Sequence, residues 1–572
     1  MADTYTLDTA PEGVRATSRR AREVLWAQPR LVSIAFGTWF WWAALVPSLL
    51  PRSAFIQGVI GAVSFAVGWG VGSLVGQIWD RAWARAGRRD PLLAARHWPL
   101  VAVVALAVVA AVVGTVMWLR WQNDQRRMVG PDEVLGLDDA VTLWVVTLVL
   151  VAVVVLIGRL VGLAVIRVDE QLPRLWPNLV RHLVAGAAFA VVVIGALMAL
   201  LSFGVMRFLD AKYAEADAAP IPGLLAPQTA TVSGGSGSLV QWTSLGAEGR
   251  LFTAGTVSTD ELRTFRPGSD PKPPIRVYVG LKDAPDAAAR ADLAVKELER
   301  TGAFQRKYLV VWTVTGTGWV DPVAAAGLEY AAAGDTAIAA QQYSYLPSWI
   351  SFLVDKDEAA EAGTALYTAV HERWSQLAPD TRPELVLFGE SLGSFGSEAT
   401  FGRATPTETL RAAAEAADSV LWVGPTGDNV GWNALLASRQ PGSPVWAPVY
   451  GDGSVRLVDH SQELAGTPEP KVLWVQHPSD PVGWWSWSTL WSRPAWMEQP
   501  TGDDVPQEPS WFPVVSFLQA TFDLMNGFSA SPGHGHNYNP DFAYAWAALV
   551  APPDWTGADT ERLAQTLVGV SG

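Results

Sequence analysis

The stretch ELVLFGESLGSFGS, residues 384–397, decides the fold of the larger part of this chain. An apolar run at residues 385–388 leads directly into GESLG (residues 389–393), which matches the G-x-S-x-G pattern of a strand, a sharp turn and a helix. Glycine is needed there because the turn is strained and a Cβ would keep the strand and the helix apart. The pattern predicts that Ser391 lies at the tip of the turn, with its hydroxyl at the end of a sheet.

Composition limits the chemistry available to the chain. At 572 residues it is too long for a single core, so two or more domains are expected. The absence of cysteine excludes disulfides, thiol catalysis and zinc–thiolate sites. His371 and Glu372 are not followed by a second histidine at the zinc-binding spacing, and no G-x-x-x-x-G-K phosphate loop occurs. We therefore expect neither a metal ion nor a cofactor.

Charge divides the chain into two unlike parts. Residues 1–205 hold 18 arginines, no lysine and 13 acidic side chains, whereas the whole chain has a formal net charge of −14. The first part is therefore mildly basic and the remainder strongly acidic. This distribution predicts a membrane-embedded part followed by a water-exposed domain. An acidic domain of this kind also argues against nucleic acid as a partner.

Apolar runs near the roughly 20 residues that cross a bilayer recur five times after a polar tail at residues 1–30. They cover residues 31–50, 55–78, 99–119, 141–166 and 183–205. In the second run, Gly68, Gly72 and Gly76 recur every four residues and present a small-residue strip for close helix packing. We predict an α-helical membrane domain of about five transmembrane helices over residues 31–205, with the lipid bilayer as its partner.

Arginine is concentrated on one side of these predicted spans. The N-terminal tail, the loop with Arg81 and Arg85, and the loop with Arg174 and Arg181 all fall on that side. By the positive-inside tendency this side, and with it the N terminus, faces the cytoplasm. An odd number of spans then places everything after residue 205 on the outer face of the cell membrane.

Beyond the spans, residues 206–274 are rich in proline, glycine and serine and are expected to form a linker or transition segment. From residue 275 to the end at 572, strand patterns alternate with helical patterns, which indicates a mainly parallel sheet flanked by helices. The predicted strands cover residues 275–281, 308–314, 337–343, 385–388, 420–423 and 472–475. Because ligands bind beyond the carboxyl ends of such strands, Ser391 stands at the expected place for a site.

A nucleophilic serine needs a base, and the base needs an orienting carboxylate. The glycine-rich segment at residues 531–538 carries His534 and His536, either of which can act as the base, and we favour His536. Asp480 follows the last predicted strand and is preferred over Asp428, which follows the strand before it. The order serine, aspartate, histidine is that of the α/β-hydrolase triad.

An oxyanion formed at this serine needs hydrogen-bond donors. One is expected to be the backbone amide of Leu392, and the second the amide of Gly316 or Thr317, in the glycine-rich loop after a predicted strand. Aromatic residues near these positions suggest a substrate surface, for which we name Trp319, Trp484 and Trp485. The alternative for the tryptophans is that they pack the domain or seat it on its own membrane helices.

Five motifs taken together resemble a bacterial α/β-hydrolase family whose members join a multi-span N-terminal membrane domain to a C-terminal hydrolase domain. They are TGTGWVDP (315–322), QYSYLPS (342–348), GESLG (389–393), SDPV (479–482) and GHGH (533–536). The resemblance covers nearly the whole chain and implies an α/β-hydrolase fold with a Ser-His-Asp triad. It leaves the substrate undefined.

These observations predict a membrane-anchored serine hydrolase that cleaves an acyl ester, of a lipid or another small molecule, through an acyl-enzyme on Ser391. Two alternatives stay open: an acyltransferase that uses the same triad with an envelope alcohol as acceptor, and a non-catalytic membrane scaffold that keeps the hydrolase fold. The sequence does not indicate an oligomeric state.

Overall fold

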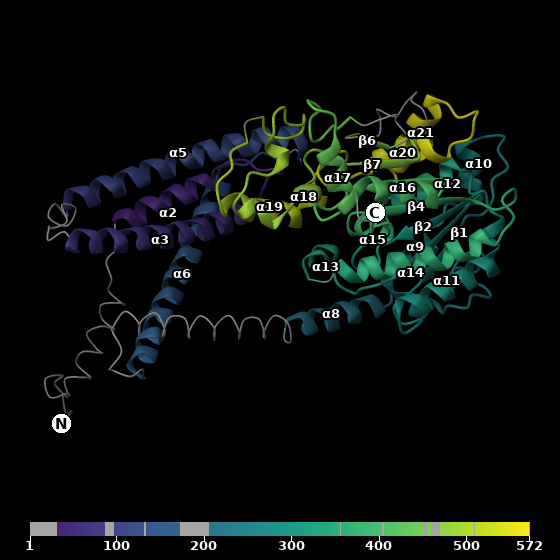
Figure 1. Cartoon of the computed structure of the whole chain (residues 1–572), viewed down its shortest axis with the longest axis horizontal. Helices are drawn as coiled ribbons and strands as arrows, with labels where there is room; N and C mark the ends of the chain where they lie inside the picture. Colours follow the sequence, from purple (N-terminus) through teal and green to yellow (C-terminus); the bar gives the residue numbers. More distant parts are fainter. Residues whose placement is uncertain are drawn as a thin grey trace.

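The computed structural model describes residues 31–85, 97–130, 133–171, 205–354, 356–402, 405–449, 455–458, 470–507 and 509–570. Figure 1 shows two parts: long helices from the first third of the chain lie at one end, and a sheet covered by helices lies at the other. We call them the helical domain and the sheet domain.

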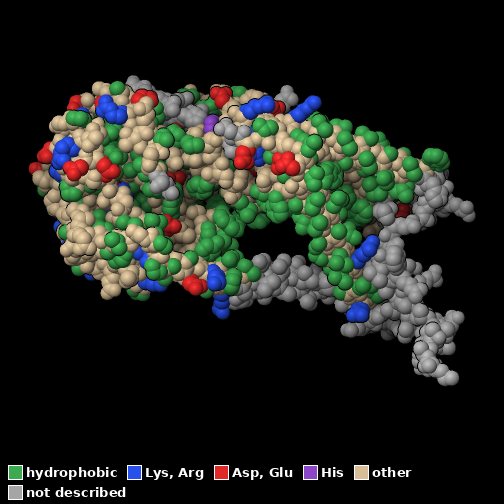
Figure 2. All heavy atoms as spheres, turned by 180° about the vertical axis from the view of Figure 1, so that it is seen from behind, with side chains coloured by type: hydrophobic (Ala, Val, Ile, Leu, Met, Phe, Trp, Pro, Cys, Tyr) green, Lys and Arg blue, Asp and Glu red, His purple; other side chains and the backbone are tan. Residues whose placement is uncertain are grey.

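Three helices of the helical domain are long and apolar enough to cross a membrane: α3 (Ala54–Arg85), α5 (His97–Val129) and α6 (Leu137–Gln171). They coincide with three of the predicted spans. Many of their apolar side chains point outward, and Leu106 and Leu148 expose 60% or more of their surface. Figure 2 shows hydrophobic side chains covering this end of the molecule. Such a surface is unfavourable in water and suits contact with lipid.

The predicted first span, residues 31–50, is wrong in its extent. Helix α2 (Leu31–Ala43) ends at Ala43, and residues 44–53 continue as an irregular segment, which we call the junction segment. Pro47 and Pro51 lack the amide hydrogen that a continued helix would need. A run of apolar residues can therefore be a helix followed by a buried connection.

The predicted fifth span, residues 183–205, lies outside the described residues except for its last residue, so the described chain gives three spans rather than five.

The glycine strip of α3 lies against α2. A Cβ on Gly68 would stand 2.5 Å from the carbonyl oxygen of Phe36, and one on Gly72 would stand 2.6 Å from that of Val32. At these two positions the predicted role in close helix packing is confirmed.

The sheet domain is built on seven parallel strands in the order β1-β3-β2-β4-β5-β7-β6. Six coincide with predicted strands, because strands buried on both faces read as continuous apolar runs. The seventh, β6, was not predicted; it is a four-residue edge strand that contains an arginine. The strands are β1 (Ile275–Val279), β2 (Tyr308–Thr313), β3 (Thr336–Gln341), β4 (Glu384–Glu390), β5 (Ser419–Val423), β6 (Val455–Val458) and β7 (Val472–Val475).

Helices cover the sheet in two groups. In the first group, α14 packs on both α11 and α15, and a Cβ on Gly363 of α14 would lie 2.6 Å from the carbonyl oxygen of Gly396 of α15. In the second, α12, α20 and α21 pack on one another, and Trp546 of α20 stacks on Phe388 of β4. The bounds are α11 (Ala287–Thr301), α12 (Pro322–Ala331), α14 (Lys356–Ser375), α15 (Leu392–Ala399), α20 (Asp541–Val550) and α21 (Gly557–Leu567).

Five further helices complete the sheet domain (Figure 1). They are α13 (Ser348–Val354), α16 (Pro406–Ala416), α17 (Val430–Ser438), α18 (Pro481–Trp484) and α19 (Val515–Met525). Of these, α19 packs against α3 of the helical domain, where its Val515 is buried beside Ile60.

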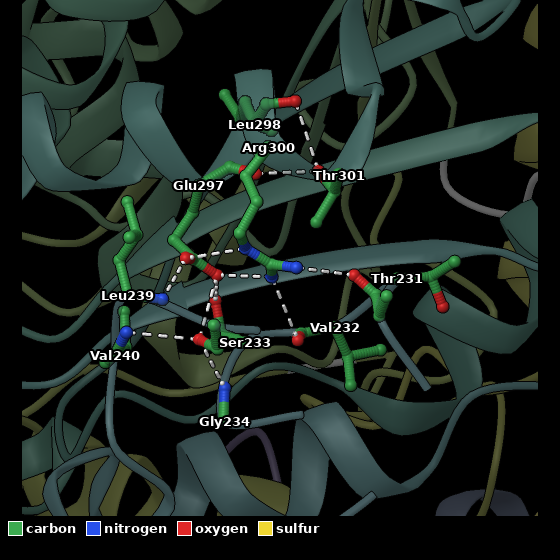
Figure 3. Close-up of polar contacts among 12 residues, drawn as sticks. Thr231, Val232, Ser233, Gly234, Leu239, Val240, Glu297, Leu298, Arg300 and Thr301 are labelled. Atoms are coloured by element: carbon green, nitrogen blue, oxygen red, sulfur yellow. Dashed lines mark hydrogen bonds and ion pairs between the residues drawn. The ribbon is translucent and has the colours of Figure 1, made fainter. Parts of the chain in front are cut away.

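The predicted linker contains helices of its own, α8 (Met206–Ala218), α9 (Gly246–Ala254) and α10 (Thr259–Phe265), and one of its contacts with the sheet domain centres on a buried carboxylate. Figure 3 shows Glu297 of α11, which is fully buried, at the centre of this contact. It accepts hydrogen bonds from Ser238 Oγ at 3.0 Å and from the Leu239 amide at 2.6 Å, and it pairs with Arg300 at 2.7 Å. The glycine- and serine-rich turn is therefore fixed against α11.

Candidate active site

Ser391 lies at the turn between β4 and α15. Its backbone has φ 54° and ψ −126°, a left-handed conformation that is strained for any residue with a Cβ. The turn is held because the Ser391 amide donates to the carbonyl oxygen of Val423 at 2.9 Å. Gly389 and Gly393 allow this geometry, since a Cβ on Gly389 would lie 2.4 Å from the Gly393 oxygen. The serine is 5% exposed, at the carboxyl end of β4.

His536 and Asp480 form a buried pair. The Nδ1 atom of His536 lies 2.7 Å from Oδ2 of Asp480, and both side chains are fully buried. Asp480 is fixed further by the Val482 amide, which donates to Oδ1 at 2.8 Å, and by the Tyr538 hydroxyl, which donates to Oδ2 at 2.6 Å. A carboxylate at Nδ1 keeps the proton on that nitrogen and leaves Nε2 as a hydrogen-bond acceptor. Nε2 has no hydrogen-bond partner in the described part of the chain.

Gly424 brings the histidine ring to the serine turn. It follows Val423, whose carbonyl oxygen accepts the Ser391 amide. A Cβ on Gly424 would stand 2.5 Å from Cε1 of His536, the ring carbon between the two nitrogens. The imidazole therefore lies directly on the end of β5. Ser391, Gly424 and Asp480 follow β4, β5 and β7, which are consecutive neighbours in the sheet.

The alternative site residues lie elsewhere. The Nδ1 atom of His534 lies 3.3 Å from Oδ2 of Asp504, and Asp428 pairs with Lys356. His477 is buried, stacks on the ring of Tyr538 and contacts Asp541 at 3.0 Å, so it supports the loop that carries His536. The geometry thus brings His536 and Asp480 together and leaves His534 and Asp428 apart from this pair.

Of the expected oxyanion donors, Leu392 lines a narrow cavity at Ser391, and Thr317 lines the cavity beside it. Leu392 is the first residue of α15, where the helix itself supplies no acceptor for the backbone amide. Gly316 has φ 30°, and a Cβ there would lie 2.4 Å from the Ser348 amide nitrogen. The Thr317 hydroxyl donates to Glu248 Oε1 at 3.3 Å.

Ser391 opens into a narrow cavity that adjoins a larger one of about 340 Å³. Both cavities are lined by Ser348, Trp349, Leu524 and Phe528. The larger cavity adds Trp319 and Met525 on its apolar side, and Glu248, Thr315 and Thr317 on its polar side. Burial raises the pKa of Glu248.

Of the three predicted substrate-facing tryptophans, only Trp319 lines this pocket. Trp484 is buried in the core and donates to the Pro478 carbonyl oxygen at 2.8 Å, and Trp485 is buried behind Phe352, which itself lines the narrow cavity. These two rings thus lie outside the lining of both cavities, and a cluster of tryptophans in sequence does not show which rings face inward. The pocket residues that sequence reasoning missed, including Trp349 and Phe528, carry no chemical motif; Trp349 directly follows the QYSYLPS stretch.

Two buried carboxyl groups stand behind the site. Burial raises the pKa of Glu390, the residue before the serine, well above its usual value, and the nearby Asp321 and Asp480 carboxylates raise it further. Burial also raises the pKa of Asp321 to about 6, although the Val323 and Ala324 amides donate to it. Burial and the neighbouring carboxylates therefore favour the protonated form of Glu390, directly before the serine turn.

Comparison with known proteins agrees with the observed fold. A sequence model of the α/β-hydrolase family matches residues 275–563, and a second one, for the N-terminus of an α/β-hydrolase family, matches residues 45–256. No curated protein and no solved structure gave a match. Since the first match alone spans half of the chain and coincides with the sheet domain, the chain belongs to the α/β-hydrolase family.

Proposed function

We propose that this protein is a membrane-anchored serine hydrolase that cleaves acyl esters. The observation that carries the proposal is the arrangement at three adjacent strand ends. Ser391 lies on a strained turn, and beside it lies a His536 ring whose Nδ1 contacts Asp480 and whose Nε2 has no hydrogen-bond partner among the residues that the structure describes. Nucleophilic acyl transfer requires a serine hydroxyl next to an imidazole that can accept its proton and that is itself oriented by a carboxylate.

The chemistry follows from these positions. Ser391 Oγ attacks the ester carbonyl carbon while His536 Nε2 takes its proton, and the Leu392 amide stabilises the resulting oxyanion. The carbon–oxygen bond then breaks, and the alcohol leaves with the proton that His536 returns. Water, activated by the same imidazole, attacks the acyl-enzyme and releases the carboxylic acid and free Ser391. Asp480 keeps the imidazole in the correct tautomer through both steps.

A lipid ester is the substrate class that the pocket supports best. The cavity at Ser391 is walled by Trp349, Leu524 and Phe528, and the adjoining cavity adds Met525. Trp349, Met525 and Phe528 also expose 40%, 50% and 53% of their surface. Trp349 belongs to α13, Met525 ends α19 and Phe528 lies three residues beyond it; both helices lie on the side of the sheet domain nearer to the helical domain (Figure 1). Exposed apolar groups around a pocket mouth suit a substrate that arrives from a bilayer.

The helical domain indicates on which side of the membrane the sheet domain lies. Leu50, before α3, and Val129, at the end of α5, share a buried cluster with the sheet domain, whereas Arg81 and Arg85 lie at the opposite end of α3. With arginine on the cytoplasmic side, the sheet domain lies outside the cell membrane.

A fluorophosphonate probe tests the proposal, because it reacts with a serine that an adjacent base has activated. In native membranes, the full chain should form one adduct, on Ser391, that mass spectrometry locates. The Ser391→Ala variant should not react, and Ser375→Ala, at an exposed serine of α14, should react as the unaltered protein does. Nitrophenyl esters of increasing acyl length then test the lipid substrate: rates independent of acyl length would contradict it.

A further inference from the structure

Arg52 of the junction segment is buried between the two domains. Its guanidinium donates to Ser48 Oγ at 2.6 Å and to Gln57 Oε1 at 3.1 Å, both in the helical domain. Its Nε lies 3.5 Å from Oδ1 of Asp523 on α19 of the sheet domain, and both side chains are at most 1% exposed. Because an unpaired buried charge is costly, each of these two charges depends on the other domain for its compensation.

One face of α19 is bound to the junction segment. Asp523 Oδ2 accepts a hydrogen bond from the Leu49 amide at 3.1 Å. Four residues earlier on the same helix, Gln519 Nε2 donates to the carbonyl oxygens of Ala44 and Val46, at 3.1 and 2.8 Å. Residues four apart lie on one face of a helix, so the helical domain holds α19 along a full turn.

The C-terminal end of α19 reaches the catalytic pocket. Leu524, next to Asp523, lines both cavities at Ser391. Two residues beyond the helix, the Gly527 carbonyl oxygen accepts the backbone amide of His536 at 3.0 Å. The ring of Phe528 then meets the His536 ring edge-on, with centroids 4.6 Å apart. A shift of α19 would therefore be transmitted to the imidazole.

The loop that carries His536 also touches the helical domain directly. The Ser531 amide donates to the carbonyl oxygen of Val129 at 3.3 Å, and its hydroxyl donates to that of Gly130 at 3.0 Å. At Gly535, a Cβ would lie 3.3 Å from Cδ2 of Leu50. The histidine loop is thus supported by the end of α5 and by the junction segment, as well as by α19.

We infer that the junction segment is a positioning element of the active site, with Arg52 as its central residue, and that the membrane domain is part of the catalytic unit as well as an anchor. This inference rests on the proposed function. Catalytic groups must be held within about 0.5 Å of their working positions. Arg52 holds His536 in position indirectly. Arg52 compensates the charge of Asp523, and Asp523 and Gln519 fix α19. The end of α19 in turn fixes His536.

The test measures acylation of Ser391 by the fluorophosphonate probe in the full chain, separating the rate constant of reaction from the affinity for the probe. Arg52→Gln leaves the buried Asp523 carboxylate uncompensated and should lower the reaction rate constant on the order of 10- to 100-fold, with little change in affinity. Arg52→Lys, which keeps the charge, should retain more of the rate. The double variant Arg52→Gln/Asp523→Asn, which has no unpaired charge, should also recover rate. Arg127→Gln, at a 74% exposed arginine of the same domain, is the control.

Folding of each variant is checked by its elution profile and thermal unfolding in detergent. If Arg52→Gln does not fold, Ser531→Ala and Gln519→Leu give the same comparison without a buried unpaired charge, and each should lower the rate constant. Folded variants that react at the unaltered rate would overturn the inference while leaving the proposed function intact. An unaltered protein that does not react at Ser391 would overturn both.

Discussion

His536 Nδ1 and Asp480 Oδ2 lie 2.7 Å apart inside the protein, although 56 residues separate them in the chain. The contact exists because Asp480 follows β7, while the loop that carries His536 folds back over the end of the neighbouring strand β5. It fixes both the orientation and the tautomer of the imidazole.

Replacing Asp480 with Asn should lower the rate of Ser391 acylation on the order of 10³-fold or more, because an amide no longer enforces the proton on Nδ1. The shape of the side chain is kept, so folding should be little changed. The measurement is the reaction rate constant with the fluorophosphonate probe. Asp428→Asn, at the carboxylate that pairs with Lys356, serves as the control. A loss below threefold for Asp480→Asn would show that this carboxylate does not orient the base.

Replacing Gly424 with Ala should reduce acylation at least tenfold, because the new Cβ would stand 2.5 Å from Cε1 of His536. Gly424 has φ 53°, so part of the effect is backbone strain. Gly442 provides a matched control: its φ is 90°, and a Cβ there would meet nothing within 4 Å. Gly442→Ala should carry the strain and keep the activity. Equal acylation rates for the two variants would show that the close approach of Gly424 to the His536 ring does not matter for the reaction.

Replacing Glu390 with Gln should change how stability depends on pH. A carboxyl whose pKa is raised by burial keeps its proton in the folded chain and loses it in the unfolded chain. The stability that Glu390 contributes is fully present below the usual glutamate pKa of 4.5. It is lost as the pH rises towards the pKa in the folded chain, at about 1.4 kcal/mol of unfolding free energy per pH unit. Glutamine does not titrate, so the Glu390→Gln variant lacks this pH dependence of the unfolding free energy.

The unfolding temperatures of Glu390→Gln and the unaltered protein should therefore diverge in favour of the variant as pH rises from 5 to 9, in roughly the window above pH 4.5 that the raised pKa defines. Asp321 contributes its own pH dependence to both proteins. The exposed Glu372→Gln, on α14, is the control. A difference that stays constant over this range would mean that Glu390 is ionised in the folded chain.

The buried pair of Arg276 and Glu329 should matter more to stability than exposed pairs do. Arg276 Nε lies 2.6 Å from Glu329 Oε1, and both side chains are at most 1% exposed. Arg276→Met leaves the carboxylate unpaired and should lower the unfolding free energy by about 3–5 kcal/mol. Arg263→Met, which breaks an exposed pair with Asp260, should cost at most about 1 kcal/mol. Chemical unfolding of the full chain measures both, and equal losses would contradict the prediction.

The sheet could be predicted from sequence because its strands are buried on both faces and so appear as unbroken apolar runs. The same rule missed β6, a short edge strand. It also overextended the first helix, because hydropathy does not distinguish a membrane helix from the buried junction segment. That segment is apolar because it packs against the sheet domain, which only the folded structure reveals.

For the site, the turn at Ser391 and the carboxylate after β7 follow from local patterns. The choice between His534 and His536 does not, because both lie in one glycine-rich loop and only the fold shows which ring contacts Asp480. The pocket walls escaped prediction for another reason: Leu524 and Phe528 are ordinary apolar residues, and their role comes from where α19 ends. The contacts of Arg52 also carry no sequence signal, because they join it to Asp523 at the other end of the chain.

The role of His536 as the base is tested by comparing acylation of Ser391 in three forms of the full chain: unaltered, His536→Ala and His534→Ala. If the imidazole of His536 deprotonates Ser391, His536→Ala should react at least 10³-fold more slowly with the fluorophosphonate probe, while His534→Ala should keep at least half of the unaltered rate. Folded His536→Ala protein that still reacts at Ser391 at the unaltered rate would show that His536 is not the base.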